Sequence, residues 1–473
     1  MLESDVTVTG LALDSRLVKP GDLFFACLGT NQDGRQFIPD AIQKGASAIL
    51  AEMDENQPDL HMHGSIPFFS IKHLNQHVSE IAACFYNYPA NSMHIVGITG
   101  TNGKTSCAHF LADILHHIHM PCGIMGTLGN GVVGNLLASD LTTPDAITIQ
   151  KTLAEFRDKG LKYVAMEVSS HSLDQGRVNG IPFTVGIFTN LTREHLDYHH
   201  TMEAYYAAKK KLFDDPCLKY AVVSSDDAFG RNIIASRQNV ISYSMKSSDV
   251  DVFADQVKLT PAGITANLHT PWGEGELHTR LIGQFNISNI LAVLTTLCLL
   301  KIPFSTVLDS LQNLAPVPGR MQVLGGFGKP LVVVDYSHTP DSLEKALSAL
   351  KEHGQGKLYC VFGCGGDRDK GKRPLMAKTA EQLADFVIVT DDNPRTEDPE
   401  QIVQDILKGL SCPDKTIVQH NRSKAIHDAI QYAKAGDTVL IAGKGAETVQ
   451  LIGNVSFPFS DVAHVIKSLK YYK

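Results

Sequence analysis

The glycine-rich segment Gly97–Ser106, Gly-Ile-Thr-Gly-Thr-Asn-Gly-Lys-Thr-Ser, constrains the fold of this 473-residue chain more than any other feature. The apolar run His94–Val96 precedes it, and the helical pattern Cys107–Leu115 follows it. A strand, a glycine turn, Lys-Thr and a helix, in this order, form a loop that holds a nucleotide triphosphate. The strict pattern has a glycine where Ile98 stands, so we interpret the segment as a variant loop in which Gly100 makes the turn.

The size and composition of the chain predict a multidomain globular protein. A chain of this length is too long for one hydrophobic core, and two to four domains are expected. Hydrophobic residues make up 43% and charged residues 19% of the sequence, which is ordinary for a soluble protein. The net charge of −8, without a long basic run, argues against general nucleic-acid binding.

Cysteines and apolar runs indicate the cellular environment. The nine cysteines are scattered and none has Cys-x-x-Cys spacing, which is typical of reduced thiols in a cytoplasmic protein without a zinc site. Met1–Asp5 has neither a basic nor an apolar character, so we expect no export signal. The run Ile290–Leu300 is too short to span a membrane, and we expect a buried helix.

Strand-like and helix-like runs alternate along most of the chain, which predicts an α/β fold with mostly parallel sheets. We predict three domains: a small N-terminal α/β domain (1–89), a central domain with a mostly parallel sheet of the P-loop type (90–320), and a C-terminal Rossmann-like doubly wound sheet (321–473). A polar, strand-rich insertion near residues 250–282 interrupts the alternation.

Polar residues at predicted strand ends are the first candidates for a site in the central domain. Glu167 follows the strand Tyr163–Met166, where its carboxylate can share a magnesium ion with Thr105. The segment after the next strand is rich in acids and histidines, so at least one functional role is expected there; these residues are Glu194, His195, Asp197, His199 and His200. The run Lys209–Lys211 is typical of a solvated helix face.

Further candidates lie in the C-terminal third. Arg320 can bind a phosphate, and Asp335, at a strand end, can accept hydrogen bonds from ribose hydroxyls. A glycine-rich loop presents Arg368 to an anion, although its glycines do not have the spacing of a dinucleotide-binding loop. The turn Thr390–Arg395 again ends a strand, and Arg395 suits the bidentate recognition of a carboxylate.

In their order, these motifs resemble those of the Mur ligase family, the ATP-dependent enzymes that build the peptidoglycan stem peptide. Gly100–Thr105 is similar to that family's phosphate loop, and the resemblance extends over nearly the whole chain. Within the family it is strongest to the members that add meso-diaminopimelate to UDP-N-acetylmuramoyl-L-alanyl-D-glutamate. The segments that carry this finer resemblance are Leu13–Arg16, Gly21–Phe24, Asp33–Arg35, Met166–His171 and Asp392–Arg395.

The resemblance implies a role for each matching residue. The ATP-binding residues would be Gly100, Thr101, Asn102, Gly103, Lys104, Thr105, Ser106, Asn286, Arg320 and Asp335. The UDP-substrate would contact Leu13, Ser15, Thr30, Asn31, Gln32, Thr142, Thr143, Ser169, Gln175 and Arg177. The amino acid would contact Arg368, Asp392, Asn393, Pro394, Arg395, Gly443 and Glu447. Magnesium would be held by Thr105, Glu167, His195 and Lys209.

The implied chemistry is amide formation through an acyl phosphate in a cytoplasmic monomer, with Lys104, His195 and Lys209 as catalytic residues. Lys209 stands where the family has a carbamylated lysine, and a carbamate offers oxygens to a cation that an ammonium would repel. The chain departs from the family pattern at Ser337, where alanine is usual, and at Ala446, where histidine is usual.

Two alternatives remain at the level of the sequence. A sister ligase on the same scaffold would add lysine, D-Ala-D-Ala or, on folate, glutamate. Asp-Asn-Pro-Arg at 392–395 disfavours the lysine enzyme, and Asp-Ser-Arg at 14–16 disfavours the folate enzyme. A nucleotide-switch or motor ATPase would use the loop for conformational control and would hydrolyse ATP without an amino acid.

Overall fold

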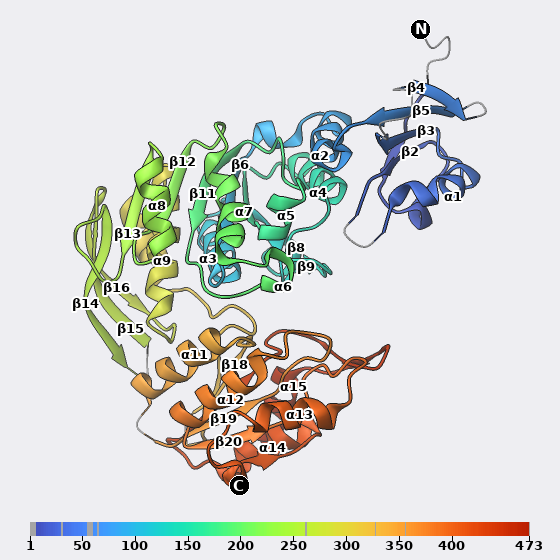
Figure 1. Cartoon of the computed structure of the whole chain (residues 1–473). Coiled ribbons are helices and arrows are strands. Elements are labelled where there is room, and N and C mark those ends of the chain that lie inside the picture. The colour runs from blue at the N-terminus through green and yellow to red at the C-terminus, as the bar shows by residue number, and fades with distance from the viewer. Residues whose placement is uncertain are drawn as a thin grey trace. The chain divides into compact units, whose positions relative to one another are not determined.

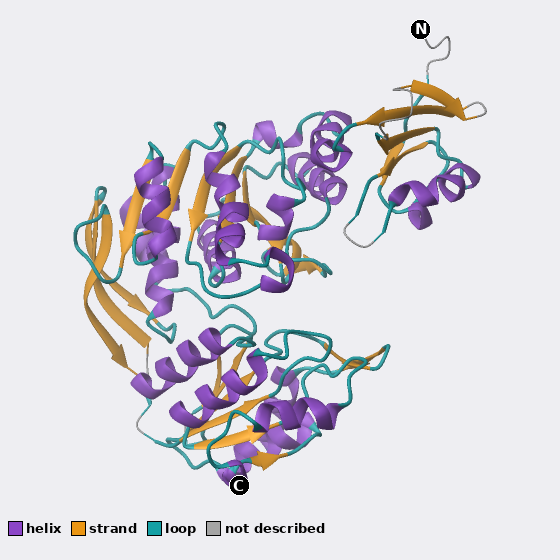
Figure 2. Cartoon of the chain, viewed as in Figure 1, coloured by secondary structure: helices purple, strands orange, loops and turns teal. Residues whose placement is uncertain are grey.

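The computed structural model describes residues 6–29, 32–53, 60–63, 66–260, 263–326, 328–354 and 356–472. Their contacts divide the chain into two compact units. The first unit comprises Met1–Thr99, His119–Ile187 and Glu203–Ala221, and the second comprises Gly100–Ile118, Phe188–Met202 and Val222–Lys473. The three domains predicted from the sequence follow other boundaries, and they stay a prediction. Figures 1 and 2 show the chain by residue number and by secondary structure.

The N-terminal part of the first unit is a five-stranded sheet with the order β1-β2-β3-β5-β4, in which only β4 is antiparallel. Successive strand residues point to opposite faces, so Phe24 and Ile49 pack with α1 whereas Phe25 and Leu50 pack with α2. The elements are β1 (Gly10–Ala12), β2 (Asp22–Ala26), α1 (Ile38–Gln43), β3 (Ala48–Glu52), β4 (Leu60–His63), β5 (Ile66–Ile71) and α2 (Leu74–Phe85), with 3-10 turns at Ser15–Leu17, Gly34–Phe37 and Pro89–Ser92.

The rest of the first unit contains the strand that leads into the nucleotide loop. Its strands have the order β11-β6-β10-β7-β8-β9, in which β6, β10 and β7 are parallel and β7, β8 and β9 form antiparallel pairs. The elements are β6 (His94–Thr99), β7 (Cys122–Gly126), β8 (Gly129–Val132), β9 (Asn135–Leu137), α4 (Ala146–Asp158), β10 (Tyr163–Glu167), α5 (Ser170–Asp174), β11 (Phe183–Phe188) and α7 (Met202–Asp214).

The second unit begins with the helix after the nucleotide loop. This helix, α3, packs against α9, which is buried over nearly its whole length, so the expected buried helix is confirmed. Strands β14, β15 and β16 form an antiparallel meander at the predicted polar insertion. The elements are α3 (Lys104–His117), α6 (Leu196–His199), β12 (Tyr220–Ser224, shared with the first unit), α8 (Ala228–Ser236), β13 (Val240–Ser244), β14 (Val252–Thr260), β15 (Gly263–Thr270), β16 (Gly273–Thr279), α9 (Phe285–Leu299) and α10 (Phe304–Leu311).

The C-terminal sheet of the second unit is doubly wound, as predicted, with the order β17-β18-β22-β19-β20-β21 and only β17 antiparallel. Val333 packs with α11, α12 and α13 on one face, and Val332 packs with α14 and α15 on the other. The elements are β17 (Gln322–Gly325), β18 (Leu331–Asp335), α11 (Pro340–His353), β19 (Leu358–Phe362), α12 (Lys372–Leu383), β20 (Phe386–Val389), α13 (Pro399–Leu407), a 3-10 turn (Pro413–Lys415), β21 (Ile417–Val418), α14 (Arg422–Tyr432), β22 (Thr438–Ala442), β23 (Val449–Ile452), β24 (Val455–Pro458) and α15 (Asp461–Lys470).

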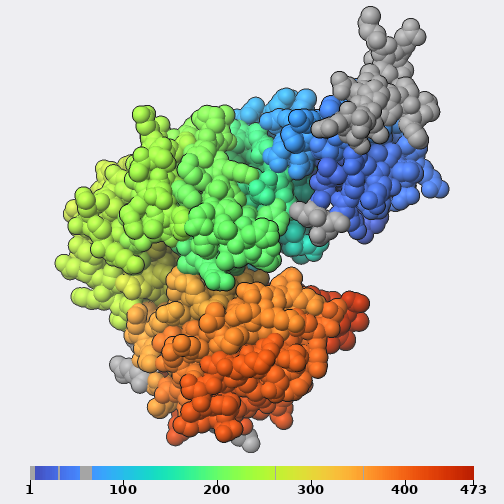
Figure 3. All heavy atoms as spheres, viewed as in Figure 1, coloured from blue at the N-terminus to red at the C-terminus, as the bar shows by residue number. Residues whose placement is uncertain are grey.

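Strand β22 comes late in the chain but lies between β18 and β19, so the strand order reverses next to it. Ligands of open α/β sheets bind at such a switch point, outside the carboxyl ends of the strands. Figure 3 shows the same view with all heavy atoms as spheres, coloured by residue number. In the part of the chain that the structure describes, each helix is too short or too polar to cross a lipid bilayer.

Candidate active site

The nucleotide loop leaves β6 and enters α3 through two glycines with left-handed backbone. Gly100 has φ +141° and Gly103 has φ +91°. A Cβ at Gly100 would lie 2.0 Å from Oγ1 of Thr189, and a Cβ at Gly103 would lie 2.5 Å from Oδ1 of Asn289. The loop therefore needs glycine at both positions, for the backbone angle and for space, which agrees with the variant loop expected from the sequence.

The segment after β11 holds the loop from one side. The backbone N–H of Thr101 donates to the carbonyl oxygen of Asn190 at 2.8 Å, and the N–H of Asn102 donates to Oδ1 of Asn190 at 3.0 Å. The ammonium of Lys104 donates to the carbonyl oxygens of Gly100 and Thr101, each at 2.8 Å. These bonds keep the predicted phosphate-binding cation on the loop.

Of the residues predicted to face the nucleoside, Arg320 is placed at the loop. Its Nη2 lies 3.4 Å from Oγ1 of Thr105, and its guanidinium stacks over the ring of Tyr336 at 4.2 Å. Asp335 accepts a hydrogen bond from the backbone N–H of Met321 at 2.7 Å and another from the hydroxyl of Ser337. Asp335 therefore also orders the connection that carries Arg320.

Asn286, the third predicted nucleoside contact, lies at the start of α9 and is buried. Its amide donates to the carbonyl oxygen of Ile282 at 2.8 Å, and its Oδ1 accepts from Asn289 at 3.2 Å. The structure thus assigns Asn286 a part in the helix start, and its contact with a nucleoside stays a prediction.

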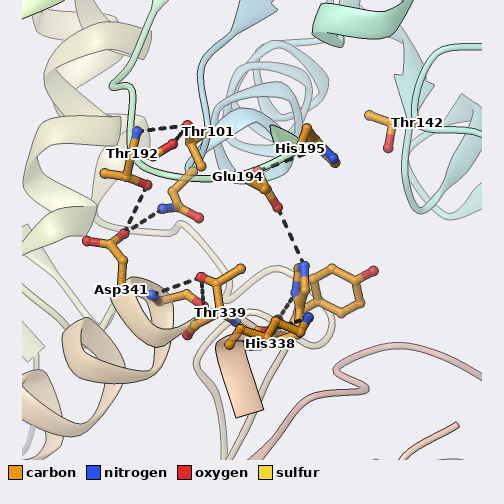
Figure 4. A network of polar contacts seen from close by, with 12 residues as sticks. Thr101, Thr142, Thr192, Glu194, His195, His338, Thr339 and Asp341 are labelled. Carbon is orange, nitrogen blue, oxygen red and sulfur yellow. Dashed lines mark hydrogen bonds and ion pairs between the residues drawn. The ribbon is translucent and has the colours of Figure 1, made fainter. Parts of the chain in front are cut away.

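Glu194 is one of the acids and histidines that the sequence singled out after β11, although no particular role was assigned to it. Its carboxylate lies 3.7 Å from Nε2 of His195 and 3.6 Å from Nε2 of His338 (Figure 4). Burial alone would raise the pKa of Glu194, but the two histidines and Lys104 lower it well below its usual range. The anion between these groups fixes the position of His195, whose backbone is left-handed with φ +55°. The acid next to His195 in the sequence was the available signal.

Within the first unit, Glu167 ends β10 and is fully buried. Its carboxylate accepts from the backbone N–H of Thr127 at 2.9 Å and from the hydroxyl of Thr127 at 3.2 Å. A Cβ at Gly126 would lie 2.2 Å from Oε1 of Glu167, so glycine makes room for the carboxylate. The strand-end position predicted for Glu167 is confirmed, and its metal-binding role stays a prediction.

The residues expected in the muramoyl-peptide groove form one hydrogen-bonded group with Glu167. Thr143 donates to the carbonyl oxygen of Glu167 at 2.8 Å and accepts from the N–H of Ser169 at 3.0 Å. Arg177 donates to the carbonyl oxygen of Thr143 and to Oε1 of Gln175, both at 2.9 Å. Thr142 joins the group through Thr127. The structure thus brings all five predicted residues together.

Lys209 differs from its two neighbours on α7. It is 1% exposed, and its ammonium lies 4.6 Å from the centre of the Tyr205 ring. Lys210 pairs with Asp214, and Lys211 pairs with Asp174 on the surface. The expectation of a solvated lysine face is therefore wrong for Lys209, because helical spacing turns this one position toward the interior. A buried lysine is the form that can lose its proton and react.

The residues expected to hold the uridine nucleotide follow two neighbouring parallel strands. Leu13 and Ser15 come after β1, and Gln32 comes in the connection after β2. The carboxyl ends of parallel strands meet at one edge of a sheet, so the described members of this set lie at one edge. Thr30 and Asn31, also expected here, lie outside the described residues.

The amino-acid set follows the carboxyl ends of β19, β20 and β22 in the second unit. Asp392 and Asn393 are buried beside Lys444, whose side chain is fully buried. The Lys444 ammonium donates to Oδ1 of Asn393 at 2.8 Å and to Oε2 of Glu447 at 2.7 Å, and Asn393 donates to the same Glu447 oxygen at 2.9 Å. Sequence reasoning missed Lys444, although it stands between the predicted Gly443 and Glu447.

Gly443 leaves space for one carboxylate of this group. Its φ is +121°, and a Cβ there would lie 2.4 Å from Oδ2 of Asp392 and 3.8 Å from Nη2 of Arg422. Burial raises the pKa of Asp392, and the charges of Arg422 and Lys444 oppose this increase. Arg422 itself forms a fully buried pair with Asp461 at 2.8 and 2.7 Å. Sequence reasoning missed this pair too, because nothing in the chain links two residues so far apart.

Two arginines of the predicted amino-acid set, Arg395 and Arg368, add positive charge near these carboxylates. Arg395 follows the buried Pro394, has φ +52°, and donates to the carbonyl oxygen of Gly366 at 2.9 Å. Burial lowers the pKa of Arg395, and the nearby charge of Arg368 lowers it further. Arg368 is exposed. Two guanidinium groups so close that the charge of one lowers the pKa of the other form a site that an incoming carboxylate would stabilise.

Comparison with known protein families gives three matches along the chain. Residues 7–86 match the model described as "Mur ligase family, catalytic domain", residues 98–297 match "Mur ligase middle domain", and residues 319–445 match "Mur ligase, glutamate ligase domain".

Similar proteins span nearly the whole chain. The UDP-N-acetylmuramoyl-L-alanyl-D-glutamate–2,6-diaminopimelate ligase of Coxiella burnetii is 48% identical, over 99% of this chain and 97% of the relative. That of Ectopseudomonas mendocina is 49% identical, over 99% and 96%. A solved structure of a ligase with the same name has a TM-score of 0.71 and 36% identity, and covers 98% of this chain and 95% of that one. The MurF ligase of Thermotoga maritima, solved with ADP, shares the fold with a TM-score of 0.66 at 19% identity, over 99% and 98%. These matches, the glycine loop that leads into α3 and the charged residues at the carboxyl ends of the strands show that the chain belongs to the Mur ligase family.

Proposed function

We propose that this protein is an ATP-dependent amide ligase that joins meso-diaminopimelate to the D-glutamate of UDP-N-acetylmuramoyl-L-alanyl-D-glutamate during peptidoglycan synthesis. The observation that carries the proposal is the group of opposite charges at the C-terminal sheet, in which the guanidinium of Arg395 lies near that of Arg368 and near the carboxylates of Asp392 and Glu447. A zwitterionic end of a diamino acid has the matching charges. The relatives named for this reaction, at nearly half identity over almost the full length, support it.

The chemistry follows from the poor reactivity of a carboxylate, which would have to expel oxide when an amine attacks. ATP transfers its γ-phosphoryl group to the D-glutamyl carboxylate, which gives an acyl phosphate and ADP. The amine then attacks the carbonyl carbon, the C–O bond to phosphate breaks, and the ammonium proton passes to a base. In this scheme Lys104 and the N-terminus of α3 bind the phosphates and stabilise the charge of the transferring group.

Magnesium belongs to the proposal, and the donor types fit it. The carboxylate of Glu167 and the hydroxyl of Thr105 are hard oxygen ligands. His195 is fixed beside Glu194, and Lys209 would contribute oxygens once carbamylated. No cluster of three or more His, Cys, Asp or Glu side chains with metal-binding geometry occurs among the described residues. A bound magnesium ion would offset negative charge on the phosphoryl group.

We propose that Arg395 selects the amino acid. Lysine lacks the distal carboxylate of diaminopimelate, so lysine would leave the half-buried Arg395 guanidinium without its partner. A site built around such a polar group can reject the analogue by roughly 10⁴-fold. Because the reaction consumes ATP and a nucleotide sugar, we place it in the cytoplasm, and we expect a monomer, which light scattering tests.

Product mass spectrometry tests the proposal. The enzyme is incubated with ATP, magnesium, the UDP-muramoyl dipeptide and one amine at a time: meso-diaminopimelate, L-lysine, D-Ala-D-Ala or glutamate. The tripeptide product with diaminopimelate is the expected result, and preference for another amine would point to a sister ligase. ATP hydrolysis that needs no amine would support a switch ATPase. Oxygen-18 in the substrate carboxylate is expected to appear in the released phosphate.

A variant of Arg395 distinguishes a role in choosing the amino acid from a role in ATP binding. Arg395→Ala is expected to lose most activity with diaminopimelate while the affinity for ATP hardly changes. Arg231→Ala removes an exposed arginine from α8 and serves as the matched control. Equal rates of the wild-type enzyme with lysine and diaminopimelate would refute the role of Arg395.

A further inference from the structure

The first turn of α11 contacts the nucleotide loop through one carboxylate. Oδ2 of Asp341 accepts from Nδ2 of Asn102 at 2.9 Å and from Oγ1 of Thr192 at 3.3 Å (Figure 4). Asn102 belongs to the loop, and Thr192 belongs to the segment after β11. Asp341 therefore joins two segments of the nucleotide site to a helix of the C-terminal sheet.

The position of Asp341 is fixed by the local structure of its helix. Thr339 and Ser342 form a reciprocal capping box, and Pro340 occupies the first helical position. An acid in the first turn is favourable beside the free N–H groups of a helix. Lys345, one turn later, lies 2.9 Å from the same Asp341 oxygen. These contacts hold the carboxylate in place before any ligand binds.

A second contact joins the same segments. Glu194, two residues after Thr192, lies 3.6 Å from His338, three residues before Asp341. The N–H of Thr192 also donates to Oγ1 of Thr101 at 3.0 Å. The loop is thus supported by a chain of polar contacts that ends in the first turn of α11.

We propose that Asp341 is a positioning residue for ATP, which holds Asn102 so that the nucleotide loop is preformed. This inference rests on the proposed ATP-binding role of the loop. A loop with left-handed glycines has many accessible conformations, and an apparent dissociation constant rises in proportion as the binding-competent conformation becomes rarer. The bonds of Asp341 within the described part of the chain go to Asn102, Thr192 and Lys345, which are not among the predicted amino-acid contacts, so its effect should be confined to ATP binding.

The test compares Asp341→Ala with Glu344→Ala, which removes an exposed acid from the same helix. Binding of a non-hydrolysable ATP analogue is measured by calorimetry, without acceptor substrates, so the result does not depend on the identity of the amine. We expect the analogue to bind about tenfold more weakly to Asp341→Ala, the size of effect expected for a lost charged hydrogen bond. Glu344→Ala should leave binding unchanged. Asp341→Asn, which keeps an acceptor oxygen for Asn102, should lose less than the alanine variant.

Kinetics and a double variant distinguish positioning from a general structural effect. In Asp341→Ala the KM for ATP should rise, whereas kcat at saturating ATP and the KM for the amine should stay unchanged. If the contact with Asn102 carries the effect, Asn102→Ala combined with Asp341→Ala should bind no more weakly than the weaker single variant. Equal affinity of Asp341→Ala and Glu344→Ala for the ATP analogue would overturn the inference. So would a double variant whose dissociation constant rises by the product of the two single increases. Should Asp341→Ala fold poorly, Thr192→Val and Asp341→Asn give the same comparison.

Discussion

Breaking the buried pair between Arg422 and Asp461 is expected to destabilise the C-terminal sheet strongly. Both side chains are 0% exposed, and they are joined by hydrogen bonds of 2.8 and 2.7 Å at the first turns of α14 and α15. Arg422→Met leaves the Asp461 carboxylate buried without either bond. The cost of such an unpaired buried charge is about 3–5 kcal/mol. Asp461→Leu leaves the guanidinium unpaired and should cost a similar amount.

The double variant shows how much of each single loss comes from leaving a buried charge without its partner. When Arg422→Met and Asp461→Leu are combined, no charge is left unpaired, so the loss should be clearly smaller than the sum of the two single losses. Lys357→Met is the matched control, because it breaks a salt bridge of 2.9 Å to Asp385 that is exposed to water in the same sheet. Water already solvates those charges, so we expect the free energy of local opening to change by no more than about the error of measurement.

Hydrogen exchange is the suitable assay, because a chain with two compact units does not unfold in one step. Exchange of peptides from β22, α14 and α15 reports the free energy of local opening in each variant. A loss below about 1 kcal/mol in Arg422→Met, against the 3–5 kcal/mol expected for a broken buried pair, would refute the reasoning, as would strict additivity of the two single variants.

Two further predictions concern the same sheet. Hydrogen bonding to Arg373 lowers the pKa of Glu397 from 4.5 to about 2, so the stability that this pair contributes is complete above about pH 4.5 and is lost as the pH falls through about 2. The free energy of local opening of α12 and α13, measured by hydrogen exchange, should therefore differ between pH 6 and pH 3 more in the wild type than in Glu397→Gln, and equal differences would contradict the assignment. Gly443→Ala places a Cβ 2.4 Å from Oδ2 of Asp392 at a φ of +121°, so the KM for the amino acid should rise while the KM for ATP stays constant. Steady-state kinetics with each substrate varied in turn measure both constants. A higher KM for ATP with an unchanged KM for the amino acid would contradict the prediction.

Local sequence patterns predicted much of the architecture. The strand and helix around the nucleotide loop, the buried helix α9 and the alternating units of the C-terminal sheet all have strong apolar periodicity, and the structure confirms them. Strand ends could be predicted for the same reason, and with them the positions of Glu167 and Asp392. The short strands β7, β8 and β9 and the hairpin β23–β24 have weak patterns and were not predicted.

The contacts that complete the candidate site could not be read from the sequence. The proximity of Lys444 to Asn393, and of Asp341 to Asn102, depends on how distant segments meet at the ends of strands. The burial of Lys209 could not be predicted either. A run of lysines is usually solvated, and only the orientation of α7 buries one of them. Long-range packing determines these features, and a single sequence contains no direct signal of it.

The left-handed backbone of His195 and Arg395 has a consequence for protein engineering. Side chains with a Cβ are disfavoured at φ +55° and +52°, by an amount of about 1 kcal/mol each, whereas glycine accepts these angles without strain. A laboratory selection for heat resistance alone would therefore favour glycine at 195 and 395 and would discard two side chains of the candidate site. The same substitutions offer a way to make a stable, inactive form of the protein that could bind its substrates without converting them.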